Sequence, residues 1–322
     1  MNRVQTTFGR LSELPETKVL RAAPLAAYTR FGIGGPADIL FETSNTESFI
    51  KALQIVRTSK LPHVVAGGGT NLIVADAGFR GVVLKLTNTA LRSEGNFVFA
   101  DSGLVLQRLV DFTVAGGLKG LETMTGIPGL VGGAIYGNAG AYGHSLMERV
   151  STVCFFDGQT VREIDNAGCE FRYRDSIFKR NKSWIIFSAE LAMEPGDARA
   201  MRAKADHILD TRNRKYPPSM KCAGSIFKNY LLAELPARVT AELPAGVAIE
   251  GKVPSAWFLE QVGAKGMRAG DICVADYHAN LIYNAGNGTA RDVIGIISEL
   301  KDRVRRRWDI PLEEEVQYVG FP

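Results

Sequence analysis

The sequence predicts an α+β protein of two domains, and three observations support this prediction. The chain has 322 residues, more than the roughly 250–300 at which a single hydrophobic core stops growing. Helix-like and strand-like hydrophobic patterns follow one another along most of its length. Two glycine-rich stretches interrupt these patterns, and both lie in the first half of the chain.

The longer glycine stretch, residues 126–143, has seven glycines in eighteen residues, and the shorter one is Gly67-Gly68-Gly69-Thr70-Asn71. At roughly 0.5–1 kcal/mol per glycine relative to alanine, the longer stretch gives up a few kcal/mol of stability. Such concentrations indicate positive φ angles or backbone pressed against a ligand, and free amides after a strand can bind a pyrophosphate. We therefore expect a large cofactor with phosphates. The shorter stretch matches neither GxGxxG nor GxxxxGK[ST], so tight turns alone are an alternative explanation for it.

The first part of the chain is expected to form an α+β module around the shorter stretch. Residues 1–27 show little periodicity and are expected to be a loosely packed lead-in. Strands are expected at 37–42, 72–74 and 81–86, a helix at 46–58, and a buried run at 63–66.

A second lobe of the same domain follows, up to a junction at Pro217-Pro218. Helices are expected at 104–115 and 197–214, and strands at 150–156, 161–164 and 184–191. The remaining residues predict a mixed α/β domain. It has helices at 255–262 and around 293–307, and strands at 272–275, 280–283 and 316–319.

Composition excludes several classes of protein. A hydrophobic content of 46% and a charged content of 22% are ordinary for a soluble globular protein, and no run approaches a membrane helix or a signal peptide. The net charge of +4 suits an anionic small molecule and does not indicate nucleic acid. The four scattered cysteines predict free thiols and no metal site. We expect a cytoplasmic protein that is a monomer or a weak oligomer.

Several motifs are ambiguous on local sequence alone. Arg174, within Tyr173-Arg174-Asp175-Ser176, would usually be a surface ion pair, and Ser225 after a glycine would be a turn residue. The run Glu313-Glu314-Glu315 and the arginines at 303–307 would be solvated faces, and His278 would be structural.

Together, however, seven ordered motifs from about Tyr28 to Gly320 resemble the flavin-dependent UDP-N-acetylenolpyruvoylglucosamine reductases. These motifs are residues 29–37, 67–71, 126–141, 173–176, 224–229, 278–280 and 312–316. The resemblance implies a two-lobed FAD-binding domain of the vanillyl-alcohol-oxidase (PCMH) type at 28–216, with lobes at about 28–90 and 91–216. It also implies a smaller α/β substrate domain at 217–322.

What the resemblance implies about function is an FAD-dependent oxidoreductase with noncovalent FAD and NADPH as electron donor. Such an enzyme reduces UDP-N-acetylglucosamine enolpyruvate to UDP-N-acetylmuramate for peptidoglycan and the cell wall. The family pattern places the catalytic arginine at Arg174, the proton-donating serine at Ser225 and the catalytic glutamate at Glu315.

The same resemblance assigns the binding residues. The implied cofactor-binding residues are Gly67, Gly68, Gly69, Thr70, Asn71, Gly126, Ile127, Pro128, Gly132, Gly133, Asn138, Ala139 and Gly140. The implied substrate-binding residues are Lys228, Asn229, His278 and Asn280.

Two positions depart from the family pattern. Tyr230 stands where the family usually has proline, and Gln317 stands where an arginine is common, which removes a cation near the substrate. The short stretch between Arg174 and Ser225 indicates the shorter-loop class, which lacks a tyrosine-bearing substrate loop.

Two alternatives stay open at this point. An FAD-linked oxidase of a small alcohol or sugar would share the glycine stretches but not the catalytic motifs. A nucleotide-sugar binding protein could keep the fold without catalysis.

Overall fold

The computed structural model describes residues 3–321, and its contacts divide the chain into two compact units. The first unit comprises residues 3–23, Ala37–Gly68 and Arg80–Pro218. The second comprises Pro24–Pro36, Gly69–Phe79 and residues 219–321. Two segments near the N-terminus therefore group with the C-terminal part of the chain, and the second of them carries the end of the shorter glycine stretch.

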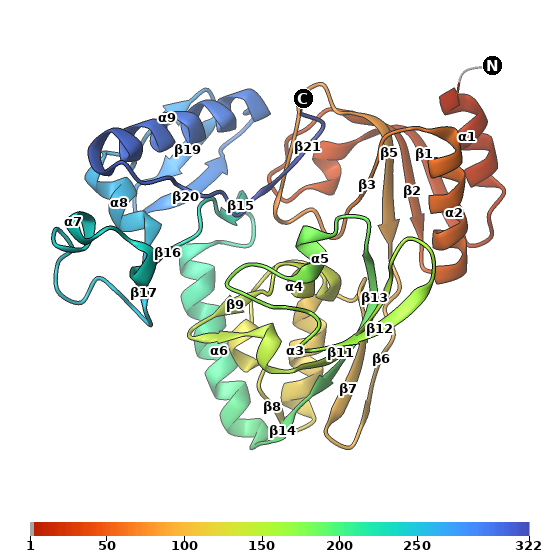
Figure 1. Cartoon of the computed structure of the whole chain (residues 1–322), viewed down its shortest axis with the longest axis horizontal. Helices are drawn as coiled ribbons and strands as arrows, with labels where there is room; N and C mark the ends of the chain where they lie inside the picture. Colours follow the sequence, from red (N-terminus) through yellow and green to blue (C-terminus); the bar gives the residue numbers. More distant parts are fainter. Residues whose placement is uncertain (1–2, 322) are drawn as a thin grey trace. The chain divides into compact units, whose positions relative to one another are not determined.

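The first lobe of the first unit is a four-stranded sheet of order β1-β2-β5-β3, with α1 and α2 side by side against it (Figure 1). Its elements are α1 (Arg3–Ser12), β1 (Thr17–Pro24), β2 (Pro36–Thr43), α2 (Thr46–Ser59), β3 (His63–Val65) and β5 (Phe79–Leu86). Asn45 caps α2, because its side chain accepts from Ser48 N at 3.0 Å. Phe49 and Leu53 of α2 lie in the core below the sheet.

The prediction for this lobe was wrong in two places. The N-terminal residues form α1 and β1 rather than a loosely packed lead-in, and Leu11 is fully buried. The run at 63–66 was expected to be buried, but His63 and Val65 are exposed. The reason is that β3 is an edge strand, which pairs with β5 alone.

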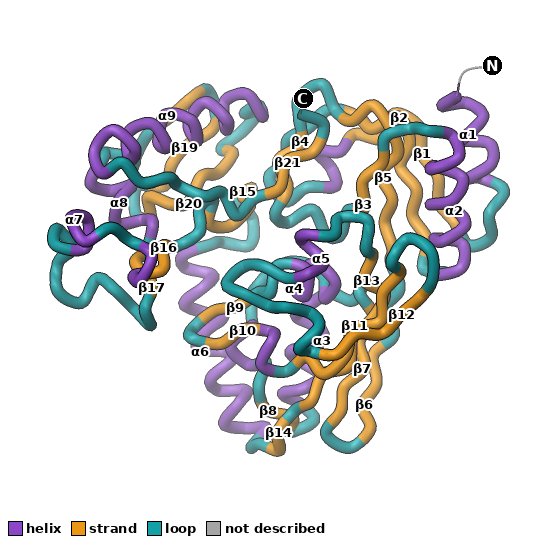
Figure 2. Tube along the Cα trace, in the orientation of Figure 1, coloured by secondary structure: helices purple, strands orange, loops and turns teal. Residues whose placement is uncertain are grey.

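The second lobe of the first unit is a five-stranded sheet of order β12-β11-β13-β7-β6. Helices α3, α4 and α6 lie beside this sheet and share its hydrophobic core (Figure 2). The strands of this lobe, which include the separate pairs β9–β10 and β8–β14, are β6 (Leu91–Glu94), β7 (Phe97–Asp101), β8 (Leu118–Lys119), β9 (Gly140–Ala141), β10 (His144–Ser145), β11 (Val150–Phe156), β12 (Val161–Asp165), β13 (Ile185–Ala192) and β14 (Glu194–Pro195). Its helices are α3 (Leu106–Ala115), α4 (Val131–Tyr136), α5 (Ile177–Arg180) and α6 (Ala198–Lys215).

The second unit has a four-stranded antiparallel sheet of order β15-β20-β19-β18, with α9 packed on it (Figure 1). Its strands are β4 (Leu72–Val74), β15 (Lys221–Ser225), β16 (Tyr230–Leu231), β17 (Lys252–Val253), β18 (Arg268–Ala269), β19 (Ile272–Ala275), β20 (His278–Asn284) and β21 (Gln317–Val319). Its helices are α7 (Ala237–Thr240), α8 (Ser255–Gln261) and α9 (Ala290–Trp308).

Helix α9 is the basic amphipathic helix of the sequence analysis. Thr289 and Asp292 form a capping box at its start, and Val293, Ile297 and Leu300 face the core. Arginines 305–307 are exposed in its last turn, as predicted for a solvated face.

The other predicted helices and strands lie within a few residues of their expected bounds, but β6, β7, α4 and β15 were not predicted. All four cysteines are free thiols. No helix among residues 3–321 is both long and apolar enough to cross a membrane.

Candidate functional site

Arg174 lies in a tight turn of the first unit, between residues 172 and 175. Arg172 N donates to Asp175 O at 3.0 Å, and Asp175 N donates back to Arg172 O at 3.2 Å. Arg174 has a φ of +54° at the second central position of this turn. That position of a turn normally takes glycine or asparagine, so an arginine there is held in a strained conformation.

Three hydrogen bonds tie this turn and the residue that follows it to residues 136–140 of the longer glycine stretch. They are Asn138 Nδ2 to Arg172 O at 2.9 Å, Arg174 Nη2 to Gly140 O at 2.8 Å, and Ser176 Oγ to Tyr136 O at 2.7 Å. Residues 136–140 therefore bond to three groups: the Arg172 carbonyl, the Arg174 guanidinium and the Ser176 hydroxyl.

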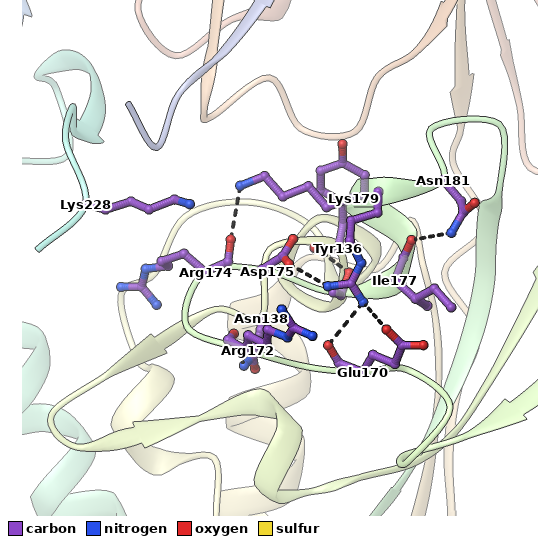
Figure 3. Close-up of polar contacts among 12 residues, drawn as sticks. Tyr136, Asn138, Glu170, Arg172, Arg174, Asp175, Ile177, Lys179, Asn181 and Lys228 are labelled. Carbon is purple, nitrogen blue, oxygen red and sulfur yellow. Dashed lines mark hydrogen bonds and ion pairs between the residues drawn. The ribbon is translucent and has the colours of Figure 1, made fainter. Parts of the chain in front are cut away.

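Charged groups surround the backbone of the turn. Lys179 Nζ donates to Arg174 O at 3.0 Å, and Arg180 pairs with Asp175 at 2.7 Å and with Glu170 at 2.6 Å (Figure 3). Burial, together with the Asp175 carboxylate, raises the pKa of Tyr136. Its hydroxyl therefore stays neutral beside the turn at physiological pH.

Asn138 owes its position to the end of α4. Asn138 N donates to Ile135 O at 3.1 Å and Ala139 N donates to Ala134 O at 2.8 Å, which is the Schellman pattern. Asn138 occupies the left-handed position of that motif, with a φ of +42° and 2% of its surface exposed. Besides donating to Arg172, its side chain accepts from Met147 N at 3.1 Å.

The second unit brings Ser225 and Glu315 onto adjoining segments. Glu315 N donates to Ile226 O at 2.7 Å, and Lys228 N donates to Glu313 O at 2.9 Å. A β-bridge between Phe227 and Glu314 lies between these two bonds. Ser225 ends β15 and is half-buried, as is Glu315.

The three consecutive glutamates have three different environments, so they are not a uniform solvated run. Glu313 is exposed and forms an ion pair with Lys228. Glu314 pairs with Lys301 Nζ at 2.8 Å. Glu315 O accepts from Asn71 Nδ2 at 2.9 Å.

Asn71 lies at the end of the shorter glycine stretch and contacts the Glu315 segment through both its side chain and its backbone. Besides the bond to Glu315 O, Asn71 O accepts from Gln317 N at 2.9 Å. The parallel pairing of β4 with β21 continues this contact. Gln317, which stands where the family commonly has arginine, is the first residue of β21 and pairs with β4.

The predicted substrate-binding residues of the second unit differ in their burial and in their hydrogen-bond partners. Asn280 is 2% exposed, accepts from Phe227 N at 2.9 Å, and donates to Phe227 O and Ser255 Oγ, each at 2.8 Å. Asn229 Oδ1 accepts from Ser255 N at 3.3 Å. His278 begins β20 and is half-buried. Asn280 therefore supports the backbone that follows Ser225.

Tyr230, the departure from the family's proline, packs its ring edge-on against Phe258, with 4.9 Å between the centroids. Burial raises the pKa of its hydroxyl, which hydrogen-bonds to no other described residue. The tyrosine thus fills core space in the second unit.

Part of the glycine content is required by the chain's own packing. A Cβ at Gly69 would lie 1.8 Å from Tyr28 O, and one at Gly132 would lie 2.8 Å from Ser102 Cβ. Neither distance is possible for a real side chain, so these two glycines need no ligand to explain them.

Other backbone in the first unit is open and fits a phosphate-bearing cofactor. A Cβ at Gly133 would meet no atom within 4 Å, and one at Gly67 would meet only Leu130 Cδ1 at 3.8 Å. Thr123 and Thr125 add buried hydroxyls that bond to no described residue. Backbone amides and hydroxyl groups are the donors that flavin and phosphate oxygens require. Among residues 3–321, no three metal-ligating side chains form a group that could hold an ion.

The sequence did not predict the roles of Asn138, Ser176 and Lys179 around Arg174. One signal was available, since an asparagine that follows a helix and a glycine is typical of a left-handed C-terminal cap. The contacts of its side chain depend on tertiary packing and had no local signature.

Two family models match this chain. The C-terminal domain of UDP-N-acetylenolpyruvoylglucosamine reductase matches residues 216–319, and an FAD binding domain matches residues 37–157.

Known proteins resemble the chain over nearly its whole length. The UDP-N-acetylenolpyruvoylglucosamine reductase of Solibacter usitatus is 60% identical over 97% of this chain and 100% of its own. The reductase of Bacillus subtilis is 34% identical over 96% of this chain and 97% of its own. The crystal structure of the Thermus caldophilus reductase superposes with a TM-score of 0.72 at 27% identity. It covers 94% of this chain and 98% of that one.

Proposed function

Because the chain belongs to the UDP-N-acetylenolpyruvoylglucosamine reductase family, we propose that Arg174, Ser225 and Glu315 carry out that family's reaction here. The enzyme is an FAD-dependent oxidoreductase of peptidoglycan precursor synthesis, with NADPH as reductant. Its product is UDP-N-acetylmuramate. The two relatives named above are reductases of this name and match over nearly their whole length, so the alternative of an alcohol or sugar oxidase is not favoured.

The first unit holds the cofactor in this proposal. The open backbone at Gly67 and Gly133 supports it, as does the match of the FAD binding model to residues 37–157. We assign contacts with FAD to this unit's share of the predicted set: Gly67, Gly68, Gly126, Ile127, Pro128, Gly132, Gly133, Ala139, Gly140 and the backbone of Asn138. When bound, FAD supplies to the enolpyruvyl double bond a hydride obtained from NADPH.

Arg174 stabilises the negative charge that collects on the substrate carboxylate as the double bond is reduced. A guanidinium presents several N–H donors in a fixed plane, and charge-assisted hydrogen bonds to an oxyanion are roughly twice as strong as neutral ones. Its retention in a strained turn by several hydrogen bonds supports this role, because such strain is concentrated at functional sites.

Ser225 delivers the proton that completes the reduction to the other alkene carbon, and the Glu315 carboxyl group assists. Positioned proton transfer is typically worth ~10² to 10⁴ in rate. The observation that carries this assignment is the backbone pairing that holds the Ser225 and Glu315 segments together. Lys228, on the same segment, pairs with exposed Glu313, and we propose that it exchanges this partner for a substrate diphosphate.

The experiment follows the two half-reactions by flavin absorbance under anaerobic conditions. NADPH should bleach the yellow protein, and UDP-N-acetylglucosamine enolpyruvate should then restore its colour. Ser225→Ala should leave the bleaching intact and abolish the recovery. Near-normal recovery in this variant would refute the role of Ser225. Recovery with oxygen but not with the enolpyruvyl substrate would restore the oxidase hypothesis.

The finer properties of the enzyme follow from the family. We propose that it works in the cytoplasm, where NADPH and the nucleotide-sugar substrate are made, and that it needs neither nucleic acid nor a membrane.

A further inference from the structure

The turn that carries Arg174 is not stable by itself. Its φ of +54° disfavours an arginine, and an isolated turn of this kind would relax toward a negative φ. Such a conformation persists only where neighbouring groups fix it. Lys179 and Arg180 bond to the turn through long, flexible side chains, which fix a backbone conformation poorly.

Asn138 is the rigid neighbour. It is almost completely buried, and the Schellman motif at the end of α4 fixes its backbone. Glycine is the usual residue at the left-handed position of that motif, but glycine has no side chain to donate a hydrogen bond. Asparagine is the residue that tolerates this backbone and also carries an amide.

Both ends of the Asn138 amide are occupied, and this determines its orientation. Met147 N–H can only donate, so the atom it faces at 3.1 Å must be the carbonyl oxygen of the amide. The NH₂ group therefore faces Arg172 O at 2.9 Å. Arg172 O is the same oxygen that accepts from Asp175 N to close the turn.

The same short segment also holds the other end of the arginine. Gly140 is two residues after Asn138, and its carbonyl accepts from Arg174 Nη2 at 2.8 Å. Residues 138–140 thus fix both the backbone of the turn and the direction of the guanidinium.

We propose that Asn138 is a positioning residue for Arg174, and that its side chain serves the arginine rather than the cofactor. This inference rests on the proposed role of Arg174. Without the Asn138 amide, the turn relaxes and the guanidinium no longer meets the substrate carboxylate. Because misplacing a catalytic group by 1 Å can slow a reaction about 10²-fold, we expect the loss of this amide to slow substrate reduction by about 10- to 100-fold.

The test uses the FAD-loaded enzyme with Asn138→Gly, which keeps the left-handed backbone and removes both side-chain hydrogen bonds. Reoxidation of the reduced protein by the enolpyruvyl substrate should slow by about 10- to 100-fold. Calorimetry should show weaker binding of that substrate to the oxidised protein. The dissociation constant of FAD and the rate of reduction by NADPH should stay within about twofold, since neither depends on Arg174.

Asn166→Ala is the matched control. Asn166 Nδ2 also bridges backbone carbonyls in this region, Met147 O at 2.8 Å and Val150 O at 2.7 Å, but it does not contact the turn. This variant should lose a similar number of hydrogen bonds and leave both half-reactions unchanged.

A double-mutant cycle separates the two proposals. In an Arg174→Ala background, Asn138→Gly should cause no further loss of the oxidative rate. If Arg174→Ala itself keeps normal turnover, the proposed function fails. If Arg174→Ala is inactive but Asn138→Gly matches the wild type, only the positioning role fails. A tenfold weaker binding of FAD in Asn138→Gly would make the side chain a cofactor ligand and overturn the inference.

A structural readout keeps the test valid if the glycine variant folds poorly. Asn138→Asp retains the shape and the bond from Met147 N, but it places a carboxylate oxygen against Arg172 O. Hydrogen exchange of the Asp175 amide, which closes the turn, should accelerate in either variant. An unchanged exchange rate would show that Asn138 does not hold the turn.

Discussion

Each of the two glycine stretches contains an asparagine whose side chain donates to a backbone carbonyl, but the two segments that they hold differ in their other support. In the second unit, Asn71 follows the shorter stretch and its side chain donates to Glu315 O. In the first unit, Asn138 near the end of the longer stretch donates to Arg172 O. Each asparagine amide therefore supports the backbone at or near a residue of the proposed catalytic trio.

The difference lies in how much other structure supports each contact. The Glu315 segment is also held by backbone bonds to Ile226 and Asn71 and by the pairing of β21 with β4. The Arg174 turn has a left-handed residue at its tip and depends on side chains for its attachment. A regular ladder tolerates the loss of one side-chain bond better than a strained turn does.

The largest expected effect is on stability at Asn138. Asn138→Ala removes two buried hydrogen bonds and puts alanine at a φ of +42°, a backbone conformation that asparagine tolerates better. We expect the free energy of unfolding to fall by about 2–4 kcal/mol, measured by urea denaturation. Asn71→Ala should lower it by about 1 kcal/mol. Equal losses at the two positions would remove the contrast between turn and ladder.

A smaller effect on the reaction rate is expected from a buried serine near each segment, Ser176 near the Arg174 turn and Ser255 near the residues after Ser225. Ser176 is fully buried and donates to Tyr136 O, while buried Ser255 accepts from Asn280 beside the segment after Ser225. Ser176→Ala should slow reoxidation by the enolpyruvyl substrate by about 3- to 10-fold, a loss of roughly 1 kcal/mol of positioning. Ser255→Ala should slow it less, because the ladder holds that segment. The reverse order in stopped-flow rates would contradict the comparison.

The smallest effect near neutral pH is expected at Cys169, because its thiol titrates only in alkaline solution. Cys169, whose carbonyl accepts from Ile177 N just after the Arg174 turn, is fully buried. Burial, with nearby Asp165, raises the pKa of its thiol from 9.0 to about 12. The unfolded thiol ionises first as the pH rises, so the stabilisation is complete below pH 9 and is lost between pH 9 and 12. Cys169→Ala should flatten the decline of the unfolding midpoint over this interval, and an unchanged decline would disprove the assignment.

The elements that depend on local pattern were predictable from the sequence. Helix α9 has caps and an apolar stripe that are visible in the chain, and strands such as β5 and β19 read directly from their hydrophobic runs. Helix α1 was missed, because its ten residues have a low apolar content and only Thr7 and Leu11 are buried.

The candidate site was predictable only in part. The motifs identified Arg174, Ser225 and Glu315, but local sequence gave them ordinary surface roles, and the family resemblance was needed to select them. The contacts of Asn71 and Asn138 span 244 and 34 residues of sequence, so no local rule could predict them. Close packing of the chain against itself already requires glycine at Gly69 and Gly132, so the choice of glycine there is no separate signal of a ligand contact.

The most direct measurement is a stopped-flow comparison of the two half-reactions in Asn138→Gly and Asn71→Ala. If the glycine stretches hold catalytic loops through these amides, reduction by NADPH should stay within about twofold of the wild type in both variants. Reoxidation by the enolpyruvyl substrate should slow in both, and more in Asn138→Gly. Equal slowing of both half-reactions, or loss of bound FAD, would mean that these side chains serve the cofactor and would contradict the positioning role.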